Sequence, residues 1–169
     1  MLYFAYGSNM SARRLSHRVG VIEALGACHL PNYHLQFHKP GADGSGKCNI
    51  LRTDPSSGRR SPYVLGMLYS LSRSQMGQLD ICEGEGTGYQ RVTVQVTNKH
   101  YISYTAQTYV ALVTQSELKP FHWYKRHVIV GAEEAGLPKD YINCIERLEE
   151  IADPDELRTQ TELKIYQQS

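Results

Sequence analysis

The chain has 169 residues and a formal net charge of +1, with its charged residues mixed along the sequence. This length predicts one domain over residues 1–169, and the charge balance excludes the basic surface of a nucleic-acid-binding protein. No stretch approaches the roughly 18 apolar residues of a membrane-spanning helix, and the four cysteines form no CxxC pair, which favours reduced thiols in a cytoplasmic protein.

The N-terminal stretch Leu2–Tyr6 is aromatic and β-prone, and it stops at Gly7-Ser8-Asn9. This pattern predicts a short buried strand that ends in a tight turn. Because Gly7 has no Cβ, a ligand can approach the backbone there, and successive N–H groups can converge into an anion-binding nest. An alternative interpretation is a plain strand-to-helix turn, in which Asn9 or Ser11 caps a helix.

Strands are also predicted in the next part of the chain, from alternating apolar and polar residues and from apolar runs between turn sequences. Loops rich in Gly, Pro, Asp and Ser flank the predicted strand 48–52 on both sides, which suggests that it lies at the rim of the fold. The predicted strand 63–71 is apolar on both faces, which is typical of a central strand. The predicted strands are 20–30, 33–38, 48–52 and 63–71, and the loops are 40–46 and 54–58.

A helix capped by Ser72 or Ser74 is predicted next, with a buried edge that extends to Cys82. The glycines that follow Glu83 end this helix. Alternation then predicts a hairpin of two strands. These strands are 92–96 and 104–112, and the turn lies at 98–100.

The apolar period becomes helical in the last third of the chain. Pro120 suits a first helical position, Gly136 ends that helix and Pro138 begins the next. A start of the capping-box kind at 153–156 predicts a marginal helix in the tail. Strands followed by helices predict an α+β fold rather than alternating βαβ units. The apolar stripe of the second helix is expected at Tyr141, Ile145, Leu148 and Ala152.

The segment Tyr3–Asn9 resembles the opening motif of the γ-glutamylcyclotransferase-like family, which includes the AIG2-like proteins. Leu79–Gly84, with a Gly-Tyr pair a few residues later, is similar to the family segment that carries the catalytic glutamate. Tyr124–Arg126 and Gly131–Tyr141 are similar to its C-terminal helical region. The four matches occur in the family's order and cover most of the chain. The resemblance implies a small mixed β-barrel flanked by helices.

The resemblance also implies an enzyme that needs no cofactor and no metal. The free α-amine of a γ-glutamyl group attacks its own γ-carbonyl, so that 5-oxoproline forms and an amino acid or amine leaves. Glu83 is the implied general acid and base, and backbone N–H groups of the first motif would hold the substrate carboxylate or the developing oxyanion. The implied substrate-binding residues are Tyr3, Phe4, Ala5, Tyr6, Gly7, Ser8, Asn9, Tyr89 and Tyr124.

Each of these roles has a structural alternative. Without the resemblance, Glu83 fits a surface acid beside a helix-ending glycine, and Glu85 is its local rival. Tyr124 fits core packing on an amphipathic helix as well as a contact to substrate. The glycine-rich turn before Tyr89 is about one residue shorter than in the family, which leaves the role of Tyr89 open. We expect burial of Glu83 against Tyr6 or Tyr89 to make it a better base.

Two other kinds of site are weaker hypotheses. Cys28, His34, His38 and Cys48 could be a zinc-binding set, but their spacing matches no structural zinc pattern. Cys82 could be a nucleophile, but its neighbour Glu83 carries the same sign of charge as a thiolate.

Two alternative functions stay open. One is a specialised cyclotransferase that acts on a γ-glutamylamine or a biosynthetic intermediate and differs in its leaving-group pocket, which we expect near residues 40–47 and 54–62. The other is a non-catalytic small-molecule-binding protein on the same fold, against which the retention of Glu83 argues. The resemblance further implies glutathione metabolism in the cytoplasm and a small-molecule γ-glutamyl substrate, and a homodimer is possible. The charge balance and the absence of a long apolar run predict neither nucleic acid nor membrane as a partner.

Overall fold

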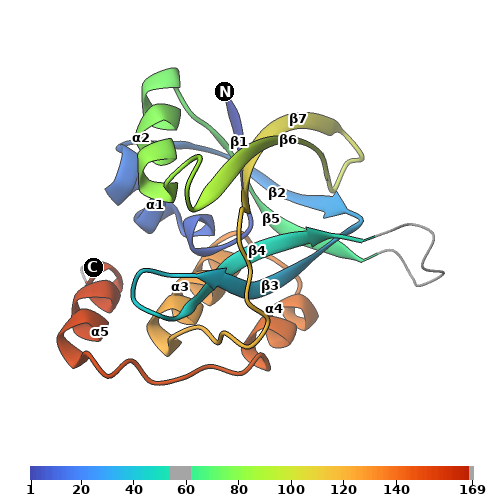
Figure 1. Cartoon of the computed structure of the whole chain (residues 1–169). Coiled ribbons are helices and arrows are strands. Elements are labelled where there is room, and N and C mark those ends of the chain that lie inside the picture. Colours follow the sequence, from blue (N-terminus) through green and yellow to red (C-terminus); the bar gives the residue numbers. More distant parts are fainter. Residues whose placement is uncertain (54–61, 168–169) are drawn as a thin grey trace.

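The fold is centred on a closed five-stranded barrel in a computed structural model that describes residues 1–53 and 62–167 (Figure 1). The strand order is β1-β5-β2-β6-β7, and the neighbours are antiparallel except for the parallel pair β1 and β7, which makes the barrel mixed. The α+β fold with a small mixed barrel is therefore confirmed. The barrel strands are β1 (Leu2–Ala5), β2 (Glu23–Pro31), β5 (Tyr63–Ser70), β6 (Tyr89–Asn98) and β7 (Ser103–Ala111).

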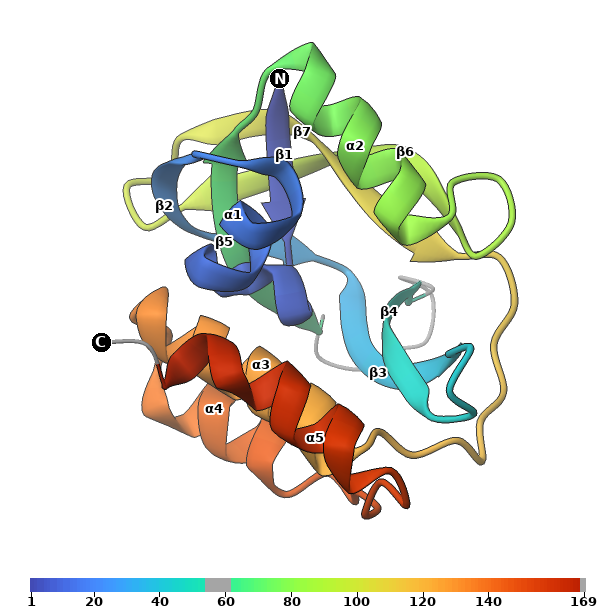
Figure 2. The same cartoon turned by 90° about the vertical axis from the view of Figure 1, so that its left-hand side faces the viewer.

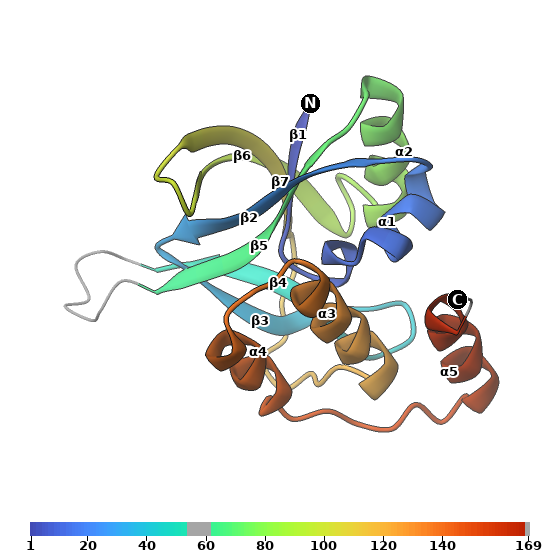
Figure 3. The same ribbon diagram turned by 180° about the vertical axis from the view of Figure 1, so that it is seen from behind.

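A separate hairpin of β3 (Tyr33–Pro40) and β4 (Gly46–Arg52) lies between the barrel and the C-terminal helices (Figures 1 and 3). It contains the strands expected at 33–38 and 48–52, and its turn is the predicted loop at 40–46. The loop expected at 54–58 lies outside the described residues, as does nearly all of the segment 54–62.

The helices form two groups (Figure 2). Two of them lie beside the barrel near its N-terminal strand, and three lie together on the other side of the β3–β4 hairpin. The first group is α1 (Ala12–Val19) and α2 (Arg73–Glu83), and the second is α3 (His122–Glu134), α4 (Lys139–Glu146) and α5 (Glu156–Leu163). Two 3₁₀ turns, η1 (Ser8–Met10) and η3 (Lys164–Tyr166), complete the order.

Side-chain caps begin three of these helices where the sequence indicates them. Ser11 accepts from the Arg14 N–H and begins α1, while Ser72 begins α2 through a capping box with Gln75. Asp155 caps α5. Because these side chains satisfy free N–H groups at the helix starts, they fix where α1 and α2 leave the barrel strands.

Three sequence expectations are wrong. α3 begins at His122 with Phe121 as its cap, so Pro120 precedes the helix. α4 ends at Glu146, and Leu148 and Ala152 lie beyond it. The buried Lys125 ammonium donates to the carbonyls of Glu146 and Leu148, at 2.7 Å each, and so takes over acceptors at the end of that helix.

The third wrong expectation is the buried edge at Cys82, which is exposed. A spacing of three residues turns a helix by about 300°, so the side chains at Met76, Leu79 and Cys82 rotate progressively away from one face. Glu83 follows Leu79 by four residues and returns to the buried face. The helix period therefore exposes the cysteine and directs the glutamate inward.

Candidate active site

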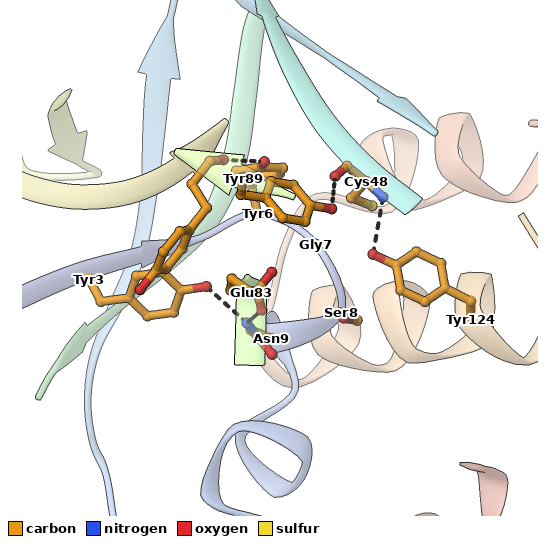
Figure 4. A pocket seen from close by; sticks show the side chains of 10 residues that line it. Tyr3, Tyr6, Gly7, Ser8, Asn9, Cys48, Glu83, Tyr89 and Tyr124 are labelled. Carbon is orange, nitrogen blue, oxygen red and sulfur yellow. Dashed lines mark hydrogen bonds between the residues drawn. The ribbon is translucent and has the colours of Figure 1, made fainter. Parts of the chain in front are cut away.

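A pocket lies where the end of β1 meets the end of α2, the start of β6 and the strand β4 (Figure 4). It brings together eight of the ten residues that the resemblance implied, although they come from three distant parts of the sequence. Cys48 and Tyr109 also line it. The lining residues are Tyr3, Tyr6, Gly7, Ser8, Asn9, Cys48, Glu83, Tyr89, Tyr109 and Tyr124.

The turn at Gly7 forms one wall of the pocket. Its φ of −113° lies outside the left-handed region, so the backbone angle at this position does not require a glycine. Close packing explains the glycine instead. A Cβ on Gly7 would lie 2.8 Å from the Cβ of Cys48 and 3.3 Å from its Sγ. Gly7 therefore allows β4 to approach the end of β1.

Glu83 is the last residue of α2, and Gly84 ends the helix in a left-handed conformation with φ of 62°. The Gly84 carbonyl accepts from the N–H groups of Thr87 and Gly88, which closes a tight turn behind the carboxylate. The Glu83 side chain is 14% exposed and forms a 2.7 Å ion pair with Arg18. A carboxylate held at a helix end and largely shielded from water can exchange a proton with a bound ligand.

Arg18 is a member of the site that the sequence did not indicate. Burial opposes its charge, but the Glu83 carboxylate keeps the pKa of the guanidinium above its ordinary value. Its side chain is 24% exposed. Only the folding of α1 against α2 brings it to the glutamate, and no local motif marks it.

Tyrosine hydroxyls form hydrogen bonds between the elements that line the pocket (Figure 4). The hydroxyl of Tyr89 donates to the Cys48 carbonyl at 2.7 Å, and that of Tyr124 accepts from the Cys48 N–H at 3.0 Å. Tyr6 donates to the Tyr109 carbonyl at 2.5 Å. Burial raises the pKa values of Tyr6, Tyr89 and Tyr124 well above their ordinary value, so these side chains stay neutral.

Two residues of the implied binding set do not line the pocket. Phe4 and Ala5 are buried in the barrel core, and the Phe4 carbonyl accepts from the Thr108 hydroxyl at 2.8 Å. The rival carboxylate Glu85 is exposed, and its closest donor is the Arg91 N–H at 3.4 Å. The structure therefore places one of the two neighbouring glutamates in the pocket and the other at the surface.

Metal ligands do not assemble within the described ranges 1–53 and 62–167: they contain no group of three or more His, Cys, Asp or Glu residues that could hold an ion. The zinc-binding hypothesis of two histidines and two cysteines thus finds no support there. Burial raises the pKa of the Cys48 thiol to about 12, which favours the neutral form. No helix among these residues is long and apolar enough to span a membrane.

Comparisons with known proteins agree with the fold. The model of the AIG2-like family matches residues 63–145, which include α2 and Glu83. The chain is 28% identical to a γ-glutamylcyclotransferase of Bos taurus over 153 residues, which are 86% of this chain and 78% of that protein. It is 27% identical to a γ-glutamylcyclotransferase of Homo sapiens, over 88% of this chain and 78% of that protein.

Solved structures show the same architecture. A structure described as a γ-glutamyl cyclotransferase superposes with a TM-score of 0.87 at 23% identity, over 99% of this chain and 98% of the other. An uncharacterised protein from Homo sapiens superposes with a TM-score of 0.80 at 26% identity, over 89% and 88% of the two chains.

Proposed function

Because the chain belongs to the γ-glutamylcyclotransferase-like family, we propose that it cyclises the γ-glutamyl group of γ-glutamyl amino acids or peptides to 5-oxoproline. The observation that carries the proposal is the Glu83 carboxylate, which lines one pocket together with the Gly7-Ser8-Asn9 turn. In this proposal Glu83 is the base, the backbone N–H groups of the turn stabilise the anion, and tyrosines that stay neutral line the space around them. Ring closure needs this combination of a proton acceptor and an anion-stabilising surface.

The reaction forms one bond and breaks another within a single substrate. The α-amine, once its ammonium has given a proton to Glu83, attacks the γ-carbonyl and forms a five-membered lactam. The γ-amide bond then breaks, and the leaving nitrogen takes the proton from Glu83. The attacking nitrogen loses its second proton to the freed Glu83 carboxylate, which passes it to the departing amine, so that the lactam is neutral and the amine leaves as an ammonium. Holding amine and carbonyl in the attack geometry can contribute about 7–11 kcal/mol. The remaining demand on the protein is proton transfer and stabilisation of the oxyanion.

The backbone at Tyr6, Gly7 and Ser8 is our proposal for the surface that receives the substrate carboxylate or the developing oxyanion. Support for this role comes from the pocket lining, which includes Tyr6, Gly7 and Ser8 together with Glu83. The hydroxyls of Tyr89 and Tyr124 are already bonded to the Cys48 backbone, so we propose that they shape the pocket wall around the ligand.

Glutathione metabolism in the cytoplasm is the setting we infer for this activity. All four cysteines are free, which fits a reducing compartment.

The experiment is an assay for 5-oxoproline released by the purified protein from a panel of γ-glutamyl dipeptides and γ-glutamylamines. We expect Glu83→Gln to lower kcat by about 10²–10⁴, because the amide keeps the shape of the side chain but cannot accept a proton. The matched control is Glu85→Gln, which alters the exposed neighbour and should leave the rate unchanged. Calorimetry should show that Glu83→Gln still binds 5-oxoproline. Near-normal turnover by Glu83→Gln would refute the assignment.

A further inference from the structure

The Glu83 carboxylate is held through one of its two oxygens. Arg18 donates from Nη1 to Oε1 at 2.7 Å, and Asn9 donates from Nδ2 to the same oxygen at 3.0 Å. Within the described part of the chain, no hydrogen bond reaches Oε2. In Figure 4 one carboxylate oxygen is joined to Asn9 and the other points away from it. The two oxygens of this carboxylate are therefore chemically different.

The two donors come from elements that are fixed independently. Asn9 lies in η1, is 6% exposed, and also donates from Nδ2 to the Tyr3 hydroxyl at 3.1 Å, so its amide nitrogen bridges Tyr3 and Glu83. Arg18 lies in the last turn of α1, which packs against α2. Neither donor belongs to the helix that carries Glu83. The carboxylate plane is thus fixed by three separate backbone elements.

A proton added to Oε1 would compete with two donors, one of them a cation, whereas a proton added to Oε2 displaces nothing. We propose that Oε2 is the oxygen that exchanges the proton with substrate and that Arg18 is a positioning residue, which acts with Asn9 to hold Oε1 and aim Oε2 into the pocket. This inference rests on the proposed function. Asn9, which the resemblance placed among the substrate-binding residues, acts through Glu83 in this arrangement.

An arginine near a pocket could instead bind the carboxylate of the substrate. The two roles separate kinetically, because a substrate-binding arginine contributes to KM whereas a positioning residue contributes to the chemical step. The Arg18–Glu83 pair is 24% and 14% exposed, so solvent screens it less than a pair on the open surface. Its loss should therefore be measurable at ordinary ionic strength.

The test compares wild-type protein with Arg18→Ala, Arg18→Lys and the control Arg13→Ala, which changes an exposed arginine of the same helix. For Arg18→Ala we expect kcat to fall about 10²-fold, as for a misplaced catalytic group, with KM within about twofold of wild type. Added guanidinium at a non-denaturing concentration should restore part of kcat, and sodium chloride of equal ionic strength should not. Arg18→Lys should keep more activity than Arg18→Ala, because it retains a cationic donor.

Two kinetic results would overturn this role: unchanged kcat in Arg18→Ala, or a raised KM with kcat unchanged. Wild-type protein that forms no 5-oxoproline would refute the proposed function itself, and the inference with it. If Arg18→Ala does not fold, a crystal structure of the wild-type protein with 5-oxoproline tests the assignment of the two carboxylate oxygens instead. There Oε2 should face the lactam N–H while Oε1 keeps both donors, and the opposite assignment of the oxygens would refute the inference.

Discussion

Gly7→Ala tests whether close packing, and not backbone conformation, explains the glycine of the N-terminal turn. The added methyl group would meet the Cys48 Cβ at 2.8 Å and the Tyr124 hydroxyl at 3.8 Å. Non-bonded carbon atoms do not approach one another to 2.8 Å, so β1 or β4 must move. Forcing an extra methyl group into a packed site typically costs about 1–3 kcal/mol. For a domain of this size that corresponds to a loss of roughly 2–12 °C in Tm.

The assay is thermal unfolding together with calorimetric binding of 5-oxoproline. We expect Gly7→Ala to weaken this binding about tenfold or more, because the moved wall carries the proposed carboxylate-binding N–H groups, and tenfold corresponds to about 1.4 kcal/mol. Ser8→Ala should weaken binding less, since the backbone N–H of Ser8 remains.

Two further variants test whether close packing against Cys48 causes the effects of Gly7→Ala. In a Cys48→Gly background, Gly7→Ala should cost less than about 1 kcal/mol, because the contacting atoms are gone. The matched control is Gly77→Ala in α2, where a Cβ would meet nothing within 4 Å. It should stabilise the protein by about 0.5–1 kcal/mol through helix propensity. Wild-type stability and binding in Gly7→Ala, or an equal cost in both backgrounds, would refute the packing argument.

Two more predictions concern thiols and acid stability. The exposed Cys82 and Cys144 should react rapidly with Ellman's reagent, whereas the other two cysteines should react only on unfolding, because burial raises their pKa values to about 11 and about 12; four fast thiols in the native protein would contradict this. A hydrogen bond from His127 lowers the pKa of Glu162 from 4.5 to about 2, so its contribution to stability is present above about pH 4.5 and is lost as the pH falls toward 2. Urea unfolding of Glu162→Gln should show a loss of roughly 1–2 kcal/mol at pH 7 and a shallower decline below pH 4.5; a decline as steep as in wild type would contradict the role of this carboxyl.

Local sequence signals predicted most helix starts and most strands. The cap at Ser72 needs only its own neighbours, so its position could be inferred without tertiary information. The end of α4 could not, because it depends on Lys125, which reaches Glu146 across a helix–helix contact. The closure of the barrel was expected from family resemblance alone. Alternating apolar and polar residues predict a strand but do not indicate which other strand it pairs with.

The candidate site likewise combines residues that local motifs identify with residues that only the fold brings together. Its glutamate and its N-terminal turn lie in recognisable motifs, whereas the contacts that orient them join residues far apart. Arg18 is 65 residues from Glu83, and Asn9 is 74 residues from it. Cys48 and Tyr109 enter the pocket from strands whose patterns indicate only that one face is buried. A single sequence indicates on which face of a helix or strand a side chain lies. It does not indicate which residue of another element contacts that side chain in the fold.

Strand pairing and helix length together explain why the glutamate reaches the turn at all. β1 and β5 are antiparallel, with Leu2 opposite Ser70 and Ala5 opposite Met67, so α2 begins beside the start of β1. Its 11 residues rise about 16 Å, and the four residues of β1 span about 13 Å. The helix therefore returns to the level of Gly7 just as it ends. One residue more or less would turn the last side chain by about 100°, so the length of α2, as much as the identity of Glu83, places a carboxylate at this pocket.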